Sequence, residues 1–129
     1  MRVYNKWHSM IKKELKKMNL THPQFVVLAS LAYLSQNGNE VTQVMISKLS
    51  GIDVMTVSQI LNLLEKNDFV KRKEHSRDTR AKAVILNKKG EEVLQKAVPL
   101  VEQIDEIFFG KLDTDEEQFK HFLARLNEE

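Results

Sequence analysis

The chain has 129 residues, a length typical of one domain that buries a hydrophobic core, and no cysteine, which excludes disulfides, thiolate metal sites and thiol redox sensing. It has no apolar stretch near the roughly 20 residues that cross a bilayer and no visible signal peptide, so we expect a cytoplasmic protein without membrane contact. The net charge of +2 hides an asymmetry: residues 1–90 carry 16 Lys and Arg against 7 Asp and Glu, and residues 91–129 carry 4 against 11. A basic body with an acidic end is typical of a protein that meets a polyanion at one end, although ordinary surface charge explains the pattern equally well.

Two helices are expected first. Residues 3–18 carry apolar side chains at helical spacing, with lysines on the other side. Residues 21–24 (THPQ) are a helix start signal, because the threonine and the glutamine can form a capping box and proline fits the first turn. The helix over 24–36 is apolar almost all the way round, which predicts a buried, central position, and Asn37-Gly38 ends it.

A helix–turn–helix pattern follows. Thr42 is predicted to cap a short helix that ends at Ser50-Gly51, and Asp53 is predicted to cap a second helix to about Lys66. Two short helices joined by a tight glycine turn, the second of them amphipathic, are the signature of this motif.

The stretch 65–90 predicts a two-stranded ribbon. Short apolar, strand-like runs flank a tip at 75–80 that is polar and mostly charged. A ribbon with arginines at its tip contributes little to a core and suits a phosphate-lined groove. Because the ribbon directly follows the helix–turn–helix pattern, we interpret it as a DNA-binding wing.

Two further helices are expected after the ribbon. Asn87 is expected to cap a long helix to about Gly110, bent at Pro99, whose apolar residues form a seam for another helix. Thr114 and Glu117 are expected to form a second capping box. The fold class is therefore mainly α with a small two- to three-stranded β wing, a winged helix–turn–helix with flanking dimerisation helices.

One domain is expected over 1–129, with a winged helix–turn–helix core at 21–90 and dimerisation helices at 1–20 and 91–129. The flanking helices carry more apolar side chains than the core can cover, which indicates a homodimer. The alternative is that the terminal helices pack on each other within one subunit. A dimer would also supply the two half-site readers that many operators require.

The second helix of the helix–turn–helix has an outward face suited to base edges. Its amide side chains can pair with adenine, its hydroxyls with several bases or with phosphates, and methionine with a thymine methyl group. A solvated polar face is the alternative, but this face lacks lysine and glutamate until Glu65. The residues expected to contact DNA from this helix are Met55, Thr56, Ser58, Gln59 and Asn62.

The ribbon supplies a second set of DNA contacts. Arg77 and Arg80 are expected to gain from the negative potential of a narrow minor groove. Asp78 is repelled by DNA and is expected to pair with Arg80 or another basic group of the wing. The residues expected to contact phosphates, which add affinity and salt dependence without sequence information, are Lys71, Arg72, Lys73 and Lys82.

Short segments distributed over the whole chain carry a family resemblance. They are 20–28 (LTHPQFVVL), 51–53 (GID), 56–58 (TVS), 64–66 (LEK), 77–80 (RDTR) and 86–90 (LNKKG). The chain resembles the MarR family of transcriptional regulators. The most specific part of the match is the wing motif at its distance from the second helix of the helix–turn–helix, which we call the reader helix.

The resemblance implies a homodimer that docks two reader helices into successive major grooves of a palindromic site, commonly as a repressor. It also implies that Arg80 enters the minor groove and that Asp78 orders it. Many members release DNA on binding a small, often aromatic, anionic effector. Gln59 stands where a basic residue is common and Met55 replaces a typical small polar residue, so we do not expect the operators of relatives to apply to this chain unchanged.

An effector pocket is weakly specified by the sequence. Aromatic and methionine side chains at helical spacing belong to a core more often than to a ligand site. The residues that can line such a pocket are Trp7, Met10, His22, Phe25 and Tyr33. The four histidines are expected to lie far apart, so neither a metal site nor a cofactor is predicted.

An enzyme is not expected, because the chain has no glycine-rich phosphate loop, nucleophile motif or cluster of histidines with carboxylates. The alternative from another class is a winged-helix protein-interaction module, whose polar helix contacts a protein. That alternative predicts no salt-dependent DNA affinity and indifference to changes at Arg80.

Overall fold

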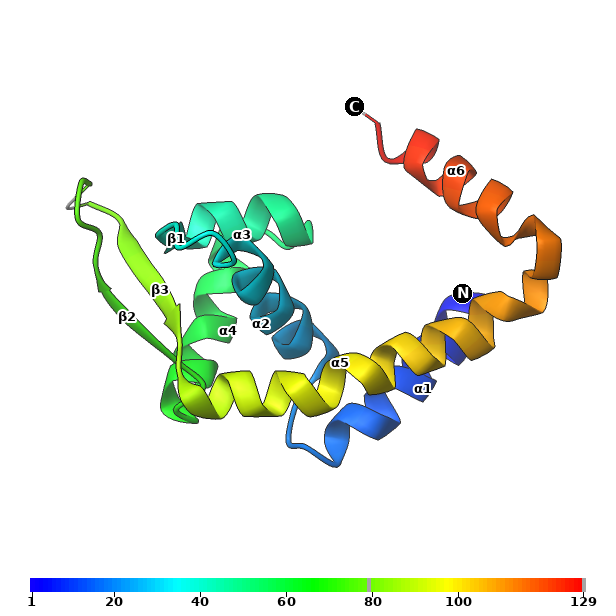
Figure 1. Cartoon of the computed structure of the whole chain (residues 1–129), viewed down its shortest axis with the longest axis horizontal. Coiled ribbons are helices and arrows are strands. Elements are labelled where there is room, and N and C mark those ends of the chain that lie inside the picture. The colour runs from blue at the N-terminus through cyan, green and yellow to red at the C-terminus, as the bar shows by residue number, and fades with distance from the viewer. Residues whose placement is uncertain (79, 129) are drawn as a thin grey trace.

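The computed structural model describes residues 1–78 and 80–128 and shows a mainly helical chain with a small antiparallel sheet (Figure 1). The elements in chain order are α1 (Arg2–Lys16), α2 (His22–Leu34), β1 (Val41–Thr42), α3 (Gln43–Ser50), α4 (Val54–Lys66), β2 (Val70–Glu74), β3 (Lys82–Leu86), α5 (Lys88–Phe109), the 3-10 helix η1 (Gly110–Asp115) and α6 (Glu116–Leu126). The strand order β1-β3-β2 makes a three-stranded sheet, which confirms the predicted fold class.

Side-chain caps begin α2, α3 and α4 as predicted. Thr21 Oγ1 accepts from the backbone N–H of Gln24 at 3.2 Å, and Gln24 Oε1 accepts from the backbone N–H of Thr21 at 3.0 Å, which completes the capping box. Thr42 and Asp53 each accept a backbone N–H from the first turn of their helices, at 3.3 and 3.0 Å. These contacts satisfy donors that a helix leaves unpaired, and they fix where α3 and α4 begin.

Two other predicted caps are wrong. Asn87 precedes α5, but its side chain makes no capping bond, and its Nδ2 donates instead to the backbone and carboxylate oxygens of Asp68, at 3.3 and 3.2 Å. Thr114 lies inside η1, and α6 begins without a side-chain cap. The physical reason is Asp113, whose φ of 54° and ψ of −123° interrupt the helical path and move the start of α6 to Glu116.

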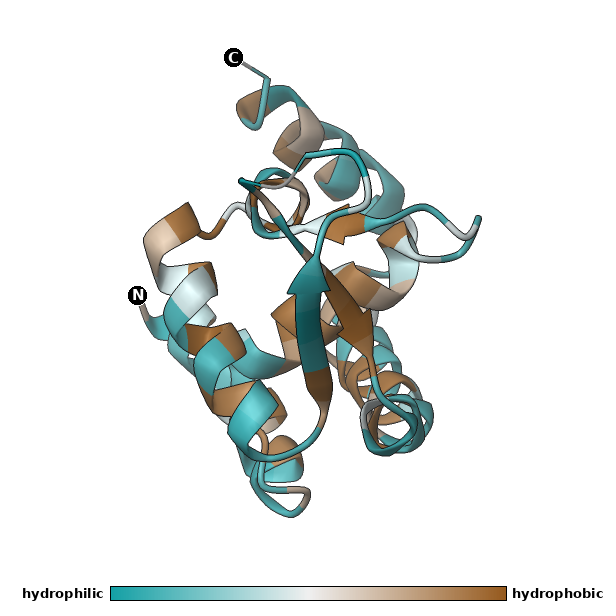
Figure 2. Cartoon of the chain, turned by 90° about the vertical axis from the view of Figure 1, so that its left-hand side faces the viewer, coloured by the Kyte–Doolittle hydropathy of each residue, from teal (hydrophilic) through white to brown (hydrophobic). Residues whose placement is uncertain are grey.

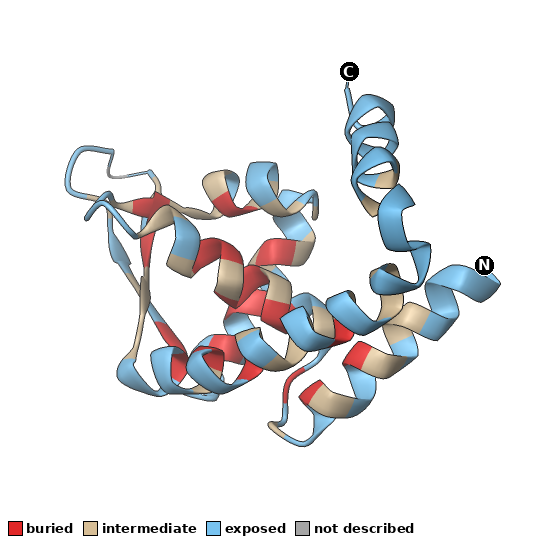
Figure 3. Ribbon diagram, turned by 45° about the vertical axis from the view of Figure 1, so that its right-hand side comes forward, coloured by how far each residue is buried: buried red, intermediate tan, exposed pale blue. Residues whose placement is uncertain are grey.

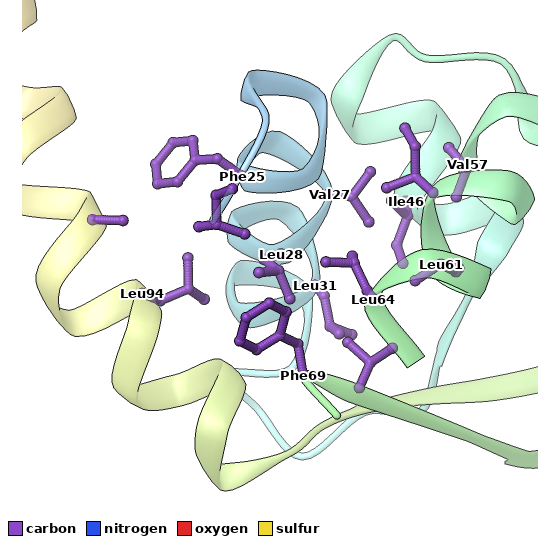
Figure 4. Close-up of a cluster of buried hydrophobic side chains, with 14 of the residues drawn as sticks. Phe25, Val27, Leu28, Leu31, Ile46, Val57, Leu61, Leu64, Phe69 and Leu94 are labelled. Carbon is purple, nitrogen blue, oxygen red and sulfur yellow. The ribbon is translucent and has the colours of Figure 1, made fainter. Parts of the chain in front are cut away.

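We call the part of the chain from α2 to β3 the winged unit. Its core surrounds α2 (Figure 4). Helix α2 contacts α3 and α4 of the helix–turn–helix as well as α1 and α5. Leu28 and Leu31 of α2 and Leu61 and Leu64 of α4 are 0% exposed, and burying each such side chain stabilises the fold by about 1.5–3 kcal/mol. The central position predicted for an all-apolar helix is confirmed.

Two glycines are required by the backbone around this core. Gly51 ends α3 with φ of 79°, a left-handed conformation that side chains disfavour, and the chain bends by 112° between α3 and α4. At Gly90 a Cβ atom would lie 2.3 Å from the backbone oxygen of Phe69, so only glycine lets α5 approach the start of the wing. Gly51 thus permits the bend between α3 and α4, and Gly90 permits the approach of α5 to the start of the wing.

Helix α5 connects the winged unit to the terminal helices. Helix α1 packs against α5 (Figure 1). Trp7 Nε1 donates to Asp105 Oδ1 at 2.8 Å between the two helices. Pro99 lies inside α5, which continues to Phe109. Figure 3 shows α6 extending away from the rest of the chain, and the described part of η1 and α6 contains no buried residue. Neither α5 nor any other single helix of the described residues has the length and apolar character to cross a membrane, although α3 and α4 pass that test when joined across their bend.

Candidate nucleic-acid interface

Helix α4 turns one face to the core and the other outward. Met55 is 73% exposed, Gln59 and Asn62 are exposed, and Thr56 and Ser58 are half-buried beside them. All five residues predicted to contact DNA from this helix therefore lie on its outward side. Their contact with DNA stays a prediction.

The first turn of α4 is arranged by Asp53. Thr56 Oγ1 donates to Asp53 Oδ1 at 2.6 Å, and the backbone N–H of Thr56 donates to Asp53 Oδ2 at 3.0 Å. These hydrogen bonds hold the pKa of Asp53 below its usual range, so the carboxylate stays charged. Because its proton is donated to Asp53, the Thr56 hydroxyl is left with lone pairs for a donor such as a base amino group.

The wing tip is exposed and ordered by a local ion pair. The Arg80 side chain is 92% exposed, and Asp78 Oδ1 accepts from its Nε at 3.4 Å and from its backbone N–H at 3.1 Å. The predicted pairing of Asp78 with Arg80 is confirmed. An exposed pair of this kind contributes little stability, so its consequence is the orientation of the guanidinium. Arg77 is exposed next to it, and Thr79 of the same motif lies outside the described residues.

A cleft separates the wing from the start of α4. Its volume is about 590 Å³, and its lining includes Ser58 from α4, Lys82 from β3 and Arg80 from the wing tip. The fold therefore brings predicted residues from the reader helix and the wing to one surface. Figure 2 shows that β2, on the outer edge of the sheet, is mostly hydrophilic, whereas β3 is hydrophobic.

Glu40 holds the base of the wing tip, and sequence reasoning missed it. The backbone N–H of Ser76 donates to Glu40 Oε2 at 3.1 Å, the Ser76 hydroxyl donates to Glu40 Oε1, and His75 Nε2 lies 3.7 Å from Oε2. The bonds from Ser76 lower the pKa of Glu40. Glu40 precedes β1 by one residue and lies far from the wing in sequence, so no local pattern could reveal the contact.

The four residues predicted to contact phosphates do not form one patch. Lys71, Lys73 and Lys82 are exposed, but Lys82 lines the cleft beside α4 whereas Lys73 lines a cavity of about 630 Å³ next to α5. The side chain of Arg72 is only 14% exposed and is bound to Glu65 of α4. Arg72 thus departs from the prediction, because its guanidinium is occupied within the chain.

The residues predicted to line an effector pocket lie in different surroundings. Phe25 is 8% exposed in the core, and Tyr33 is 63% exposed on α2. Met10 borders a cavity of about 390 Å³ between α1 and α5. Trp7 and His22 are in contact, with ring centroids 5.4 Å apart.

The prediction that the histidines lie far apart is wrong for one pair. The Nδ1 atoms of His8 and His22 are 3.0 Å apart, because the turn after α1 folds that helix back against the start of α2. Burial lowers the pKa of His22, His8 lowers it further, and Asp105 opposes the shift. The described residues contain no group of three or more ligands that could hold a metal ion.

The fold, the outward polar helix and the exposed wing define a winged helix–turn–helix protein. Residues 16–104 match the family model described as an ArnR1-like winged-helix domain. The HTH-type transcriptional regulator YdcH of Bacillus subtilis strain 168 is 35% identical over 122 residues, which are 95% of this chain and 80% of YdcH.

Solved structures show the same architecture. A mutant of Escherichia coli MarR complexed with operator DNA has a TM-score of 0.87 at 22% identity, over 98% of this chain and 89% of MarR. Bordetella bronchiseptica BpsR, whose DNA binding is regulated by 6-hydroxynicotinic acid, has a TM-score of 0.82 at 27% identity, over 96% and 86% of the two chains. The chain belongs to the MarR family of winged helix–turn–helix transcriptional regulators. Its relatives are DNA-binding regulators, not enzymes.

Proposed function

We propose that this regulator is a cytoplasmic homodimer that represses genes by binding a two-fold-symmetric operator, and that a small aromatic or anionic effector releases it. One observation carries the proposal. The same subunit has an exposed reader helix and wing at one end and an uncovered apolar surface at the other.

Base and groove contacts are assigned from exposure. The outward face of α4, with Met55 and Gln59 exposed, enters the major groove, whose width of about 12 Å admits a helix. Arg80, held by Asp78, reaches the adjacent minor groove, where its charge meets the most negative potential. Lys82 contacts a phosphate at the edge of the cleft between the two elements.

The dimer interface is assigned from the uncovered apolar face of the terminal helices. Helix α6 has 11 residues, and a helix of that length is marginal in water unless its apolar face packs against a partner. A second copy supplies that partner by two-fold symmetry, and the two reader helices would then meet half-sites about 34 Å apart. The exposed apolar residues of α1, α5 and α6 are Val3, Tyr4, Ile107, Phe122, Leu123 and Leu126.

The charge distribution supports this orientation on DNA. The basic residues are concentrated in 1–90 and the acidic ones in 91–129. An acidic segment is repelled by the phosphate backbone and a basic one is attracted to it. The arrangement favours a subunit whose winged unit faces DNA and whose terminal helices lie away from it.

Effector release is assigned by analogy with BpsR and by the position of Trp7 and His22. These two side chains lie where α1, α2 and α5 meet, and Trp7 is bonded to Asp105 of α5. A ligand inserted at this junction changes the angle between the winged unit and the dimer helices. It releases DNA only if it binds the DNA-incompetent arrangement more tightly than the competent one.

Selection from a pool of random duplexes, followed by titration across salt, tests the proposed function. We expect a two-fold-symmetric site to be enriched, with affinity that falls steeply as salt rises and falls again in Arg80→Ala. Weak binding without enrichment, unchanged by Arg80→Ala, would contradict the proposal and favour a winged-helix protein-interaction module.

A further inference from the structure

Arg72 connects the wing to both helices of the helix–turn–helix. Its Nη1 donates to Gln43 Oε1 of α3 at 3.1 Å, and its Nη2 donates to Glu65 Oε1 of α4 at 3.0 Å and to Asn62 Oδ1 of α4. The backbone N–H of Arg72 donates to the second carboxylate oxygen of Glu65 at 3.2 Å. The Arg72 side chain is 14% exposed, and it lines the cleft between α4 and the wing together with Gln43.

The carboxylate of Glu65 keeps this arrangement charged and oriented. The hydrogen bond from Arg72 lowers the pKa of Glu65, and the carboxylate therefore stays ionised through the neutral range. Glu65 accepts hydrogen bonds from both the side chain and the backbone N–H of Arg72, and these bonds fix the position of β2 along α4. The pair orients the guanidinium toward the two amide side chains.

Arg72 also fixes the orientation of two amide groups. A guanidinium only donates hydrogen bonds, so the atom that faces it must be the oxygen of Asn62 and the oxygen of Gln43. The NH₂ group of each amide then lies on the side away from Arg72. Asn62 is exposed, and Gln43 lines the cleft between α4 and the wing. Gln43 therefore presents donors to a ligand in that cleft, and Asn62 presents them on the exposed face of α4.

We propose that Arg72 is a positioning residue for sequence choice, which turns the NH₂ groups of Asn62 and Gln43 toward DNA so that they read it as donors. The inference rests on the proposed function. An amide that pairs with adenine must both donate to N7 and accept from N6, and Arg72 occupies one of the two lone pairs of the amide oxygen and so competes with the second contact. Amides that present their NH₂ groups fit guanine O6 and N7, thymine O4 or a phosphate oxygen better.

The test compares operator preference and salt dependence in single-residue variants. The base pair that Asn62 reads is defined as the position whose preference is lost in Asn62→Ala. In Arg72→Lys, which keeps the positive charge but loses the guanidinium fork, discrimination at that position should fall roughly tenfold. The slope of log affinity against log salt should stay unchanged, because no phosphate contact is removed.

Glu65→Gln is a second test variant, because it weakens the acceptor that orients Arg72, whereas a loss of negative charge alone would tighten DNA binding. We expect Glu65→Gln to lose the same base preference as Arg72→Lys. In a double variant with Asn62→Ala, the Arg72→Lys substitution should have no further effect at that position. Thermal unfolding of each variant checks its fold, and Glu65→Gln carries the test if Arg72→Lys does not fold. If Arg72→Lys and Glu65→Gln both rank operators as the parent does, this inference is overturned but the proposed function is not. A parent protein that enriches no site would overturn the proposed function together with the inference.

Discussion

The winged unit and the C-terminal arm, η1 with α6, differ in where their apolar side chains lie. In the winged unit, side chains such as Leu28 and Leu64 are 0% exposed. Within the described part of the arm no residue is buried, and Phe122 and Leu123 are 46% and 47% exposed. The winged unit has its own core, whereas the arm has an apolar face without one. We infer that the first is stabilised within the subunit and the second between subunits.

The two regions also differ in the ion pairs that their exposed charged side chains form. Arg80 of the wing is 92% exposed, with one carboxylate beside it, and is available to an external anion. On α6 the Nζ of Lys120 lies 3.6 and 3.5 Å from carboxylate oxygens of Glu116 and Glu117 on the same helix. These pairs complement the helix along its own surface. The comparison predicts that substitutions in the two regions affect different measurements.

The largest effect is expected in the core. Leu64→Ala should lower the free energy of unfolding by about 2–5 kcal/mol at every protein concentration, because it leaves a cavity among fully buried side chains. Leu123→Ala is the matched change in the arm, and its effect should appear only at concentrations where the dimer forms. Urea unfolding at several protein concentrations measures both. An effect of Leu123→Ala that is independent of concentration would place the arm in the subunit's own core.

Next in size is the effect of a charge on the apolar face of the arm. Phe122→Glu should yield monomers in sedimentation velocity and reduce operator affinity by roughly 10²-fold, since the second half-site contact is lost. Ala124→Glu adds the same charge on the opposite side of α6 and should leave the dimer intact. If both variants sediment as the parent does, the arm is not the interface.

A smaller effect, confined to DNA binding, is expected at the wing tip. Arg80→Ala should weaken operator binding by about 1–3 kcal/mol, whereas its unfolding curve should match the parent's, because the ion pair with Asp78 is exposed. Arg125→Ala removes an exposed arginine from the arm and serves as the control. Fluorescence anisotropy with a labelled operator measures the affinities. Equal losses for both variants would mean that only net charge matters.

The smallest effect is expected where α1, α2 and α5 meet. The pKa of His22 is lowered, chiefly by burial, so the folded state favours the neutral imidazole. A group with a depressed pKa contributes its stability above the unfolded pKa, about 6.5, and loses it as the pH falls through the lower folded value. Unfolding free energies between pH 5 and 8 should therefore decline on acidification, less so in His22→Gln. The same slope in parent and variant would remove His22 from this role.

Much of the fold could be predicted because its signals are local. The capping box at Thr21 and the caps at Thr42 and Asp53 join residues three positions apart, so the sequence shows them directly. The start of α6 could not be predicted, because it depends on the backbone of Asp113. Strand β1 has two residues and no alternation of its own, and it exists because Val41 pairs with Val84.

The site was predicted less completely, for a related reason. Arg72 and Arg80 are the same residue type on the same ribbon, and only their tertiary partners separate an internal connection from an exposed side chain. The contact between His8 and His22 likewise depends on how the chain turns after α1. Sequence pattern indicates which residues can act on DNA, and the packing of distant segments decides which of them are available to do so.

Hydroxyl-radical footprinting of the protein on its selected operator tests the central claim most directly. The account predicts two protected segments related by two-fold symmetry, with centres about one helical turn or roughly 34 Å apart, and a minor-groove protection beside each that disappears in Arg80→Ala. A single protected segment, or a footprint that is the same in the parent and in Arg80→Ala, would contradict it.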